Sequence, residues 1–272
     1  MPELPEVETI RRQLEKHLVG HKILGIDIRV AKIFPQGKEK LIGGRVKSAR
    51  RLGKVLIVDL DNSFSFLVHL KLTGQVIYAA PKFPNQPGKF THVVFKLDKG
   101  GQLFFNDSRK FGWIRVEKTS DVAKESFIKR LGPEPLRDLT AKKFAEIVSA
   151  SRRPIKILLM DQTRLSGVGN IYANDALWLA KIDPKSPANS LGSREVKTLY
   201  KAVLKVLKDG IKYQGASDQW YVTAEGKKGS YQEHFLAYGL EAELCKRCRK
   251  AKFIKYFLGG RGTYACPVCQ RL

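Results

Sequence analysis

The first residues of the chain combine a potential nucleophile with two potential acid or base groups. Pro2 follows the initiator Met1, and Glu3 and Glu6 lie beside it. Removal of Met1 would leave a secondary amine at the new N-terminus, and because an α-amine titrates near pH ~8, part of it is unprotonated at neutral pH and can attack an electrophilic carbon. A neighbouring carboxyl group can serve as acid or base. The same residues are also typical of a helix start with proline in its first turn and acids at its positive end, so both interpretations stay open.

The four cysteines lie close to the C-terminus and form two Cys-x-x-Cys pairs, at Cys245, Cys248, Cys266 and Cys269. This spacing is typical of a four-thiolate zinc site, and four protein ligands leave no open position for a substrate, so we expect a structural zinc ion. Between the pairs, residues 253–265 alternate and predict a β-hairpin whose turn carries Gly259 to Gly262. Arg261 would then reach a DNA phosphate, unless it is an ordinary solvated turn residue.

Composition narrows the classes of partner. The chain has 272 residues, 43% of them hydrophobic, which is enough for a sizeable core and for two domains. Lys and Arg number 50 against 26 Asp and Glu, a formal charge of +24 that favours a polyanionic partner, although ribosomal and membrane-surface proteins share this property. The sequence has neither a long apolar run nor a signal peptide, so we expect a cytoplasmic protein with no membrane contact. A reducing compartment argues against disulfides.

Periodicity predicts a β-rich first half and a helical second half. Apolar residues at helical spacing predict a helix that begins near Pro5 and ends before Gly20. Alternating or β-branched runs then predict strands at 22–30, 54–60, 64–70, 91–97 and 102–107, in a domain that ends near residue 118. Helices are predicted within 139–150, 154–165, 170–180 and 193–213. Residues 214–230 contain three glycines and no sustained period, which predicts a mobile loop.

Several motifs together resemble one family. PELPEVE at the N-terminus, GKVLI, GVGNIYA at 167–173 and the terminal GGRGTYACPVCQ resemble the formamidopyrimidine-DNA glycosylase family. The related endonuclease VIII branch usually begins PEGPE, so Leu4 favours the purine-directed branch. The resemblance implies a multidomain α+β protein with DNA in the cleft between its domains. Its parts would be an N-terminal β-sandwich-like domain at 1–118, a linker at 119–135, a helix-two-turn-helix domain at 136–237 with a lesion-capping loop at 214–230, and a β-hairpin zinc finger at 238–272.

The resemblance also implies an activity, a bifunctional DNA glycosylase and abasic-site lyase of base excision repair that removes 8-oxoguanine and formamidopyrimidines. Pro2 would displace the damaged base, form a Schiff base with the opened sugar and support β- and then δ-elimination. Glu3 would protonate the sugar ring oxygen, and Glu6 would belong to the lesion and water network. Lys54 would contact the phosphate near the lesion. The expected partner is double-stranded DNA with an oxidised purine or abasic site, bound by a monomer.

Extruding a nucleotide requires side chains that fill the vacated stack. By resemblance these are Leu72, Arg109 and Phe111; the family usually has Met at the first position, so Leu72 is a departure of similar volume. Arg109 would face the orphaned cytosine. Further DNA contacts are implied for His69, Lys156, Asn170 and Tyr238, and Ser217, Asp218 and Tyr221 would belong to the capping loop. Local sequence alone equally allows a buried core His69, a solvated Lys156, Asn170 as a helix N-cap and Tyr238 in core packing.

Three other functions remain open. The first is a sister-branch glycosylase for oxidised pyrimidines, which differs in releasing thymine glycol rather than 8-oxoguanine. The second is a zinc-containing DNA-binding protein without catalysis, which the presence of Pro2, Glu3 and Lys54 disfavours. The third is an RNA-binding or ribosomal protein, which only the charge favours and which leaves the N-terminal motif unexplained.

Overall fold

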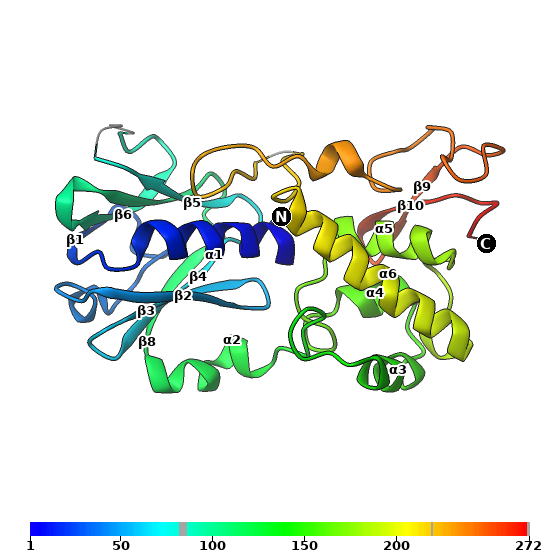
Figure 1. Cartoon of the computed structure of the whole chain (residues 1–272), viewed down its shortest axis with the longest axis horizontal. Coiled ribbons are helices and arrows are strands. Elements are labelled where there is room, and N and C mark those ends of the chain that lie inside the picture. Colours follow the sequence, from blue (N-terminus) through cyan, green and yellow to red (C-terminus); the bar gives the residue numbers. More distant parts are fainter. Residues whose placement is uncertain (82–85, 219, 271–272) are drawn as a thin grey trace. The chain divides into compact units, whose positions relative to one another are not determined.

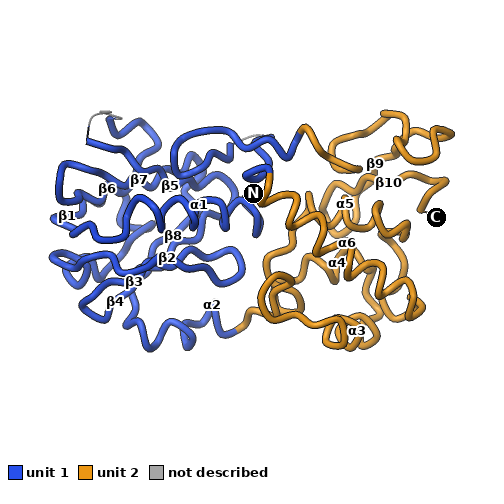
Figure 2. The backbone as a smooth tube through the Cα atoms, in the orientation of Figure 1, with its two compact units in different colours: residues 1–129, 213–232 blue, residues 130–212, 233–272 orange. Residues whose placement is uncertain are grey.

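The computed structural model describes residues 1–81, 86–218 and 220–270. These residues form two compact units (Figure 2): unit 1 consists of 1–129 and 213–232, and unit 2 of 130–212 and 233–272. This division differs from the domains that we predicted. Residues 213–232 belong to unit 1 rather than to the helical domain, most of the expected linker at 119–135 belongs to unit 1 as well, and the cysteine-bearing hairpin forms part of the helical unit.

Unit 1 contains one long helix and two antiparallel four-stranded sheets (Figure 1). One sheet has the order β1-β6-β7-β5 and the other β2-β3-β4-β8. The elements are α1 (Leu4–Leu18), β1 (Ile23–Ile28), β2 (Val46–Leu52), β3 (Val55–Leu60), β4 (Phe64–His69), β5 (Gly74–Ala79), β6 (Thr91–Leu97), β7 (Gln102–Asp107), β8 (Trp113–Lys118) and α2 (Ser126–Lys129), with short 3-10 turns at Lys38–Lys40, Asp98–Gly100 and Thr119–Lys124.

The two sheets and α1 share one hydrophobic core. Alternate residues of the strands point inward, as expected for the buried face of an antiparallel sheet, for example Leu56 and Val58 in β3 and Val93 and Phe95 in β6. On α1, Val7, Ile10, Leu14 and Leu18 join the same cluster at helical spacing. The predicted β-sandwich-like domain is therefore confirmed. The sequence reading missed β2, β5 and β8, because β2 and β8 carry several charged residues and β5 begins with a glycine.

Unit 2 is helical and ends in a two-stranded hairpin. Its elements are α3 (Ala141–Ser149), α4 (Ile155–Met160), α5 (Asn170–Ala180), α6 (Ser193–Lys212), β9 (Ile254–Leu258) and β10 (Arg261–Ala265), with a 3-10 turn at Ala188–Ser190. A further 3-10 turn, Tyr231–His234, has its first two residues in unit 1 and its last two in unit 2. Helix α5 packs against α6, α4 and β10. No helix in the described part of the chain is long and apolar enough to span a membrane.

Long-range hydrogen bonds explain why the units differ from the predicted domains. In unit 1, the Tyr78 N–H of β5 donates to the Ala224 carbonyl at 2.8 Å, which ties the segment 213–232 to a sheet. In unit 2, the Tyr264 N–H of β10 donates to Asn174 Oδ1 of α5 at 2.9 Å, and Phe253 packs with Trp178. Local sequence patterns contain neither type of pairing.

Candidate active site

The N-terminal segment is buried and leads directly into α1. Pro2 is buried, and Glu3 and Glu6 are 2% and 1% exposed. The Glu3 N–H donates to Glu6 Oε2 at 2.8 Å, which satisfies one backbone donor at the start of the helix. The helix begins two residues after Pro2, so a helix start and a nucleophilic amine are compatible readings of the same residues. Removal of Met1 would place a secondary amine next to two enclosed carboxyl-bearing residues.

The Glu6 carboxylate also holds the segment 213–232. Its Oε1 accepts the Ala216 N–H at 2.8 Å, and the Tyr221 hydroxyl donates to the Gln214 carbonyl at 3.0 Å and lies 3.4 Å from the Glu6 carbonyl. Burial, reinforced by the charge of Glu6, raises the pKa of Tyr221 well above its usual value, so this phenol stays a neutral donor. Glu6 therefore links the start of the chain to the predicted capping loop.

The three residues predicted in the capping loop have different surroundings. Ser217 closes the base of the loop: its hydroxyl donates to the Tyr221 carbonyl at 2.8 Å and accepts the Gly229 N–H at 2.9 Å. Tyr221 is 7% exposed and belongs to the unit 1 core. Asp218 is exposed. Of the three, Ser217 and Tyr221 anchor the loop, and Asp218 is the exposed residue.

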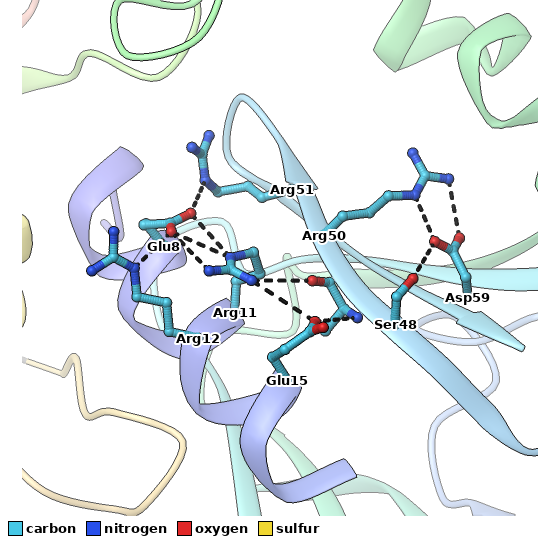
Figure 3. A network of polar contacts seen from close by, with 9 residues as sticks. Glu8, Arg11, Arg12, Glu15, Ser48, Arg50, Arg51 and Asp59 are labelled. Atoms are coloured by element: carbon cyan, nitrogen blue, oxygen red, sulfur yellow. Dashed lines mark hydrogen bonds and ion pairs between the residues drawn. The ribbon is translucent and has the colours of Figure 1, made fainter. Parts of the chain in front are cut away.

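Lys54 occupies the tight turn between β2 and β3, as predicted, and is 5% exposed. A network of charges leads from α1 to this turn (Figure 3). Arg51 donates from Nη1 to the Gly53 carbonyl at 2.8 Å and from Nε to Glu8 Oε2 at 3.2 Å. Glu8 thus connects the helix that begins at the candidate nucleophile to the turn that carries Lys54.

His69 is a packed, neutral histidine at the end of β4. It is 5% exposed, its ring meets the Phe127 ring edge-on with 5.1 Å between centroids, and its Nδ1 accepts the Lys71 N–H at 3.0 Å. Burial and the charges of Lys71 and Lys54 lower its pKa to about 3. These contacts match the core interpretation of this residue. A phosphate contact would have to use Nε2, because Nδ1 is occupied.

The three predicted stack-filling residues lie on two turns of unit 1. Arg109 and Phe111 are exposed on the turn that follows β7, with the Arg109 guanidinium 4.8 Å from the centre of the Phe111 ring. Leu72 is half-buried on the turn between β4 and β5. The sequence reading missed Asp107, a fully buried residue at the end of β7 that binds both turns. An Asp before Ser and Arg looks like an ordinary turn residue, and its position along the chain gives no signal of burial.

Asn170 is the first helical residue of α5, and Gly169 is the N-cap. The N-cap interpretation of Asn170 is therefore wrong by one residue, because Gly169 has the extended backbone of a cap while Asn170 is already helical. Its carbonyl accepts a hydrogen bond from Asn174 Nδ2 at 2.7 Å. The side chain is half-buried at the positive end of the helix dipole, where an anion is favoured.

Lys156 and Tyr238 both support the hairpin side of unit 2. Lys156 is 0% exposed, and its ammonium donates to the Gly262 carbonyl at 2.7 Å and to Thr263 Oγ1 at 2.8 Å. It therefore holds β10 next to Arg261 from the interior, rather than lying on the surface as a solvated lysine. The Tyr238 ring lies edge-on against Tyr264 with 5.3 Å between centroids, and its N–H is bound by the buried Asp175 carboxylate at 2.9 Å.

The four cysteine thiols form a cluster with the spacing of a metal site. Their Sγ atoms all lie within 4.8 Å of one another, with 3.8 Å between Cys245 and Cys269 and 3.6 Å between Cys248 and Cys266. A tetrahedral ion with metal–sulfur bonds of about 2.3 Å separates its ligands by about 3.8 Å, so the thiols fit such an ion. The Trp178 indole N–H, 3.4 Å from Cys245 Sγ, adds a donor from α5.

Arg261 is exposed at the first position of β10 and pairs with Leu258. The turn itself consists of Gly259 and Gly260, at φ 57° and 71°, rather than of the four residues from Gly259 to Gly262 that we predicted. Two successive positive φ values are required by the two-residue hairpin turn that matches the twist of the strands, and glycine adopts them without steric cost. The two-glycine turn places Arg261 at the turn end of the hairpin, opposite Leu258.

Comparisons with known proteins agree with this arrangement. Family models match at residues 1–114, "Formamidopyrimidine-DNA glycosylase N-terminal domain", and at residues 131–221, "Formamidopyrimidine-DNA glycosylase H2TH domain". The formamidopyrimidine-DNA glycosylase of Pelotomaculum thermopropionicum is 39% identical, over 100% of both chains. The structure of Lactococcus lactis Fpg in complex with abasic-site DNA is similar with a TM-score of 0.91, 37% identity and coverage of 99% of this chain and 100% of that chain. A complex of the wild-type Lactococcus lactis protein with DNA containing an oxidised pyrimidine has a TM-score of 0.90 at 37% identity, with 100% of both chains covered.

The fold and the site thus define a two-unit protein with a buried N-terminal proline, a helix-two-turn-helix region and a four-cysteine hairpin. The chain belongs to the formamidopyrimidine-DNA glycosylase family.

Proposed function

We propose that this protein is a DNA glycosylase and abasic-site lyase that excises oxidised purines, 8-oxoguanine and formamidopyrimidines, from double-stranded DNA, with Pro2 as its nucleophile. The observation that carries the proposal is the enclosure of Pro2 beside Glu3 and Glu6, at the start of a helix anchored in the core. Glu3 and Glu6 also form the capping box of α1, so the same two buried residues fix the start of the helix and hold their carboxyl groups in the segment that begins at Pro2. The double-stranded DNA partner also accounts for the charge of +24.

The chemistry follows from the residues at this end of the chain. The Pro2 nitrogen attacks the sugar C1′, and the bond from C1′ to the base breaks as the base leaves with its electron pair. The nitrogen gives up its one proton, which the departing base takes up; Glu3 then protonates the ring oxygen, and the nitrogen lone pair breaks the bond from C1′ to that oxygen, which opens the ring and leaves a charged iminium. The iminium acidifies the neighbouring C2′, so that β-elimination releases the 3′ phosphate and δ-elimination the 5′ phosphate. Hydrolysis of the remaining adduct regenerates the amine.

The other site residues would bind and orient the DNA. Lys54 and Arg261 would present cations for phosphates, Asn170 and Tyr238 would donate hydrogen bonds to phosphates, and Glu6 holds the segment 213–232 that would cover the extruded base. Leu72, Arg109 and Phe111 would fill the vacated stack. Lys156 would act by holding the Arg261 strand, and for His69 we retain a phosphate contact through Nε2 only.

Trapping with borohydride tests this function. The untagged protein, with Met1 removal verified by mass spectrometry, is mixed with a duplex containing 8-oxoguanine opposite cytosine. A covalent adduct that is lost in Pro2→Gly is the expected result. Glu3→Gln should lose excision of the base but retain adduct formation on abasic DNA, whose sugar is already open to the aldehyde. Tight binding without an adduct would favour the non-catalytic alternative.

A specific observation keeps oxidised pyrimidines as a second candidate substrate, because a related Lactococcus lactis protein has been solved with such DNA. Competing duplexes with 8-oxoguanine and thymine glycol distinguish the two. We expect faster release of 8-oxoguanine, consistent with Leu4 in PELPE. Faster release of thymine glycol would assign the protein to the pyrimidine-directed activity.

We further propose that the four-cysteine cluster holds one zinc ion. Four thiolates at tetrahedral spacing suit zinc, and with all four positions filled by protein the ion would be structural. When bound, it would fix the hairpin that carries Arg261 without taking part in base removal. Metal analysis of the purified protein should give about one zinc per chain.

A further inference from the structure

A single buried carboxylate joins the two turns that carry the predicted stack-filling side chains. Asp107 is 0% exposed. Its Oδ1 accepts hydrogen bonds from the Thr73 hydroxyl, on the turn between β4 and β5, and from the Arg109 N–H at 3.1 Å. Its Oδ2 accepts the Gly112 N–H at 2.7 Å. Because Thr73 lies on one turn and Arg109 on the other, this carboxylate links them, and the Thr73 hydroxyl also accepts the Arg109 N–H directly at 3.2 Å.

The surrounding backbone is built around this link. The Asp107 carbonyl oxygen lies 2.7 Å from His92 Nε2 of the neighbouring strand β6, which fixes Asp107 from a second side. A Cβ added at Gly112 would come within 2.6 Å of the Phe105 ring and 3.1 Å of the Asp107 carboxylate. Only glycine lets the backbone approach the carboxylate this closely. The contacts therefore leave little freedom for either turn.

Both turns also contain a lysine with a left-handed backbone. Lys71, immediately before Leu72, has φ 51°, and Lys110, between Arg109 and Phe111, has φ 56°. Non-glycine residues adopt this conformation at a cost and keep it where surrounding contacts impose it. The hydrogen bonds of the buried carboxylate to Thr73, which directly follows Leu72, and to Arg109, which directly precedes Lys110, are such contacts.

We propose that the Thr73–Asp107 hydrogen bond is a positioning device that couples the Leu72 turn to the Arg109–Phe111 turn, so that the three side chains enter the duplex as one unit. Asp107 and Thr73 touch neither the base nor the sugar in this scheme. Coupling is useful because side chains that are ordered beforehand lose less conformational freedom when they insert. The inference rests on the proposed function and adds two residues that determine discrimination of the opposite base.

Thr73→Val tests the link, because valine matches threonine in shape and removes only the hydroxyl. Thr73→Ser keeps the hydroxyl and is the conservative variant. Single-turnover excision of 8-oxoguanine is measured opposite cytosine and opposite adenine. Cleavage of an abasic site in single-stranded DNA is measured as well, because this substrate has no opposite base and no vacated stack to fill. We expect Thr73→Val to slow duplex excision about tenfold, because it removes the hydroxyl's hydrogen bond to the Asp107 carboxylate and its hydrogen bond from the Arg109 N–H, and to narrow the cytosine-to-adenine preference. Single-strand cleavage should stay within about twofold, and Thr73→Ser should resemble wild type.

Ser65→Ala is the matched control. It removes another buried hydroxyl–carboxylate bond of unit 1, from Ser65 Oγ to Asp59 Oδ1 at 2.6 Å, on the other sheet. It should lower stability without changing the opposite-base preference. If Thr73→Val keeps the wild-type preference, or loses single-strand cleavage as much as duplex excision, the inference is overturned. If the wild-type protein forms no borohydride adduct, the proposed function fails first, and the inference fails with it.

Discussion

Glu8 of α1 and Arg51 of β2 form an ion pair with 3.2 Å between Glu8 Oε2 and Arg51 Nε (Figure 3). Their side chains are 12% and 8% exposed, and Arg11 and Arg12 also bind Glu8, at 3.1 and 2.8 Å. One carboxylate thus contacts three guanidinium groups in a chain with a large excess of positive charge. Removing its charge would weaken all three contacts, including one to an arginine side chain that is only 8% exposed, which is costlier than losing an exposed pair.

Glu8→Gln should therefore lower the free energy of unfolding by about 1–3 kcal/mol at neutral pH, measured by urea denaturation. Glu146→Gln is the control, because Glu146 forms an exposed pair with Lys143 and its side chain is 50% exposed. The control should change stability by less than about 0.5 kcal/mol. Equal effects of the two substitutions would contradict a special role for the Glu8 network.

The contribution of Glu8 should disappear in acid. Burial alone raises the pKa of Glu8, but hydrogen bonds from Arg11 and Arg12 and the charge of Arg51 outweigh burial and hold that pKa below the usual 4.5. A lowered folded pKa gives stability that is present above the unfolded pKa and is lost as pH falls through the folded value. The difference in unfolding free energy between wild type and Glu8→Gln should therefore narrow below pH 4.5. A difference that stays constant with pH would exclude this linkage.

The lowered pKa of His69 predicts a second pH dependence of stability, in a higher pH range than that of Glu8. Its pKa falls from 6.5 to about 3 on folding, mainly through burial, so between these values the unfolded chain binds the extra proton. Stability should decline as pH falls below 6.5, by at most about 1.4 kcal/mol per pH unit for one proton. His69→Gln, which can still accept the Lys71 N–H, should flatten this slope in urea titrations. Parallel slopes for the two proteins would mean that another group causes the decline.

Much of the fold could be predicted from the sequence, because the responsible signals are local. The helix at 193–212 follows its apolar period, the strands at 91–97 and 102–107 follow their alternation, and the cysteine spacing predicts the metal cluster. Residues that meet across long separations gave no such signal. Glu6 and Ala216 are 210 positions apart, and nothing near Ala216 predicts that its N–H binds a carboxylate at the start of the chain.

The candidate site was predictable only in part for the same reason. Lysine is rarely buried, yet the Lys156 ammonium is enclosed, and two oxygens of β10 accept hydrogen bonds from it. The sequence does not indicate the role of Asp107, because its three hydrogen-bond donors lie on two turns that only the folded structure brings together. The predicted stack-filling residues came from family resemblance alone, since two exposed side chains and one half-buried side chain on two turns have no periodicity.

Loss of one thiol should remove the metal and loosen the hairpin. Cys248→Ser should lower the metal content, measured by mass spectrometry of the native protein, and weaken DNA binding through disorder of β9 and β10. Val268→Ala changes a 48% exposed residue between two cysteine ligands and should keep the metal. A Cys248→Ser protein with full metal content and wild-type affinity would refute the structural role of the cluster.

Salt dependence tests whether Arg261 contacts a phosphate. Each phosphate contact releases counterions, so the logarithm of the binding constant should fall linearly with the logarithm of salt concentration. Arg261→Ala should reduce the magnitude of this slope by about 1 and weaken binding to all sequences alike. Arg137→Ala is the matched control, because Arg137 is exposed and already paired with Asp138 at 2.8 Å. An unchanged slope for Arg261→Ala would place this residue outside the DNA contact, and an equal reduction for both variants would point to net charge rather than to the hairpin.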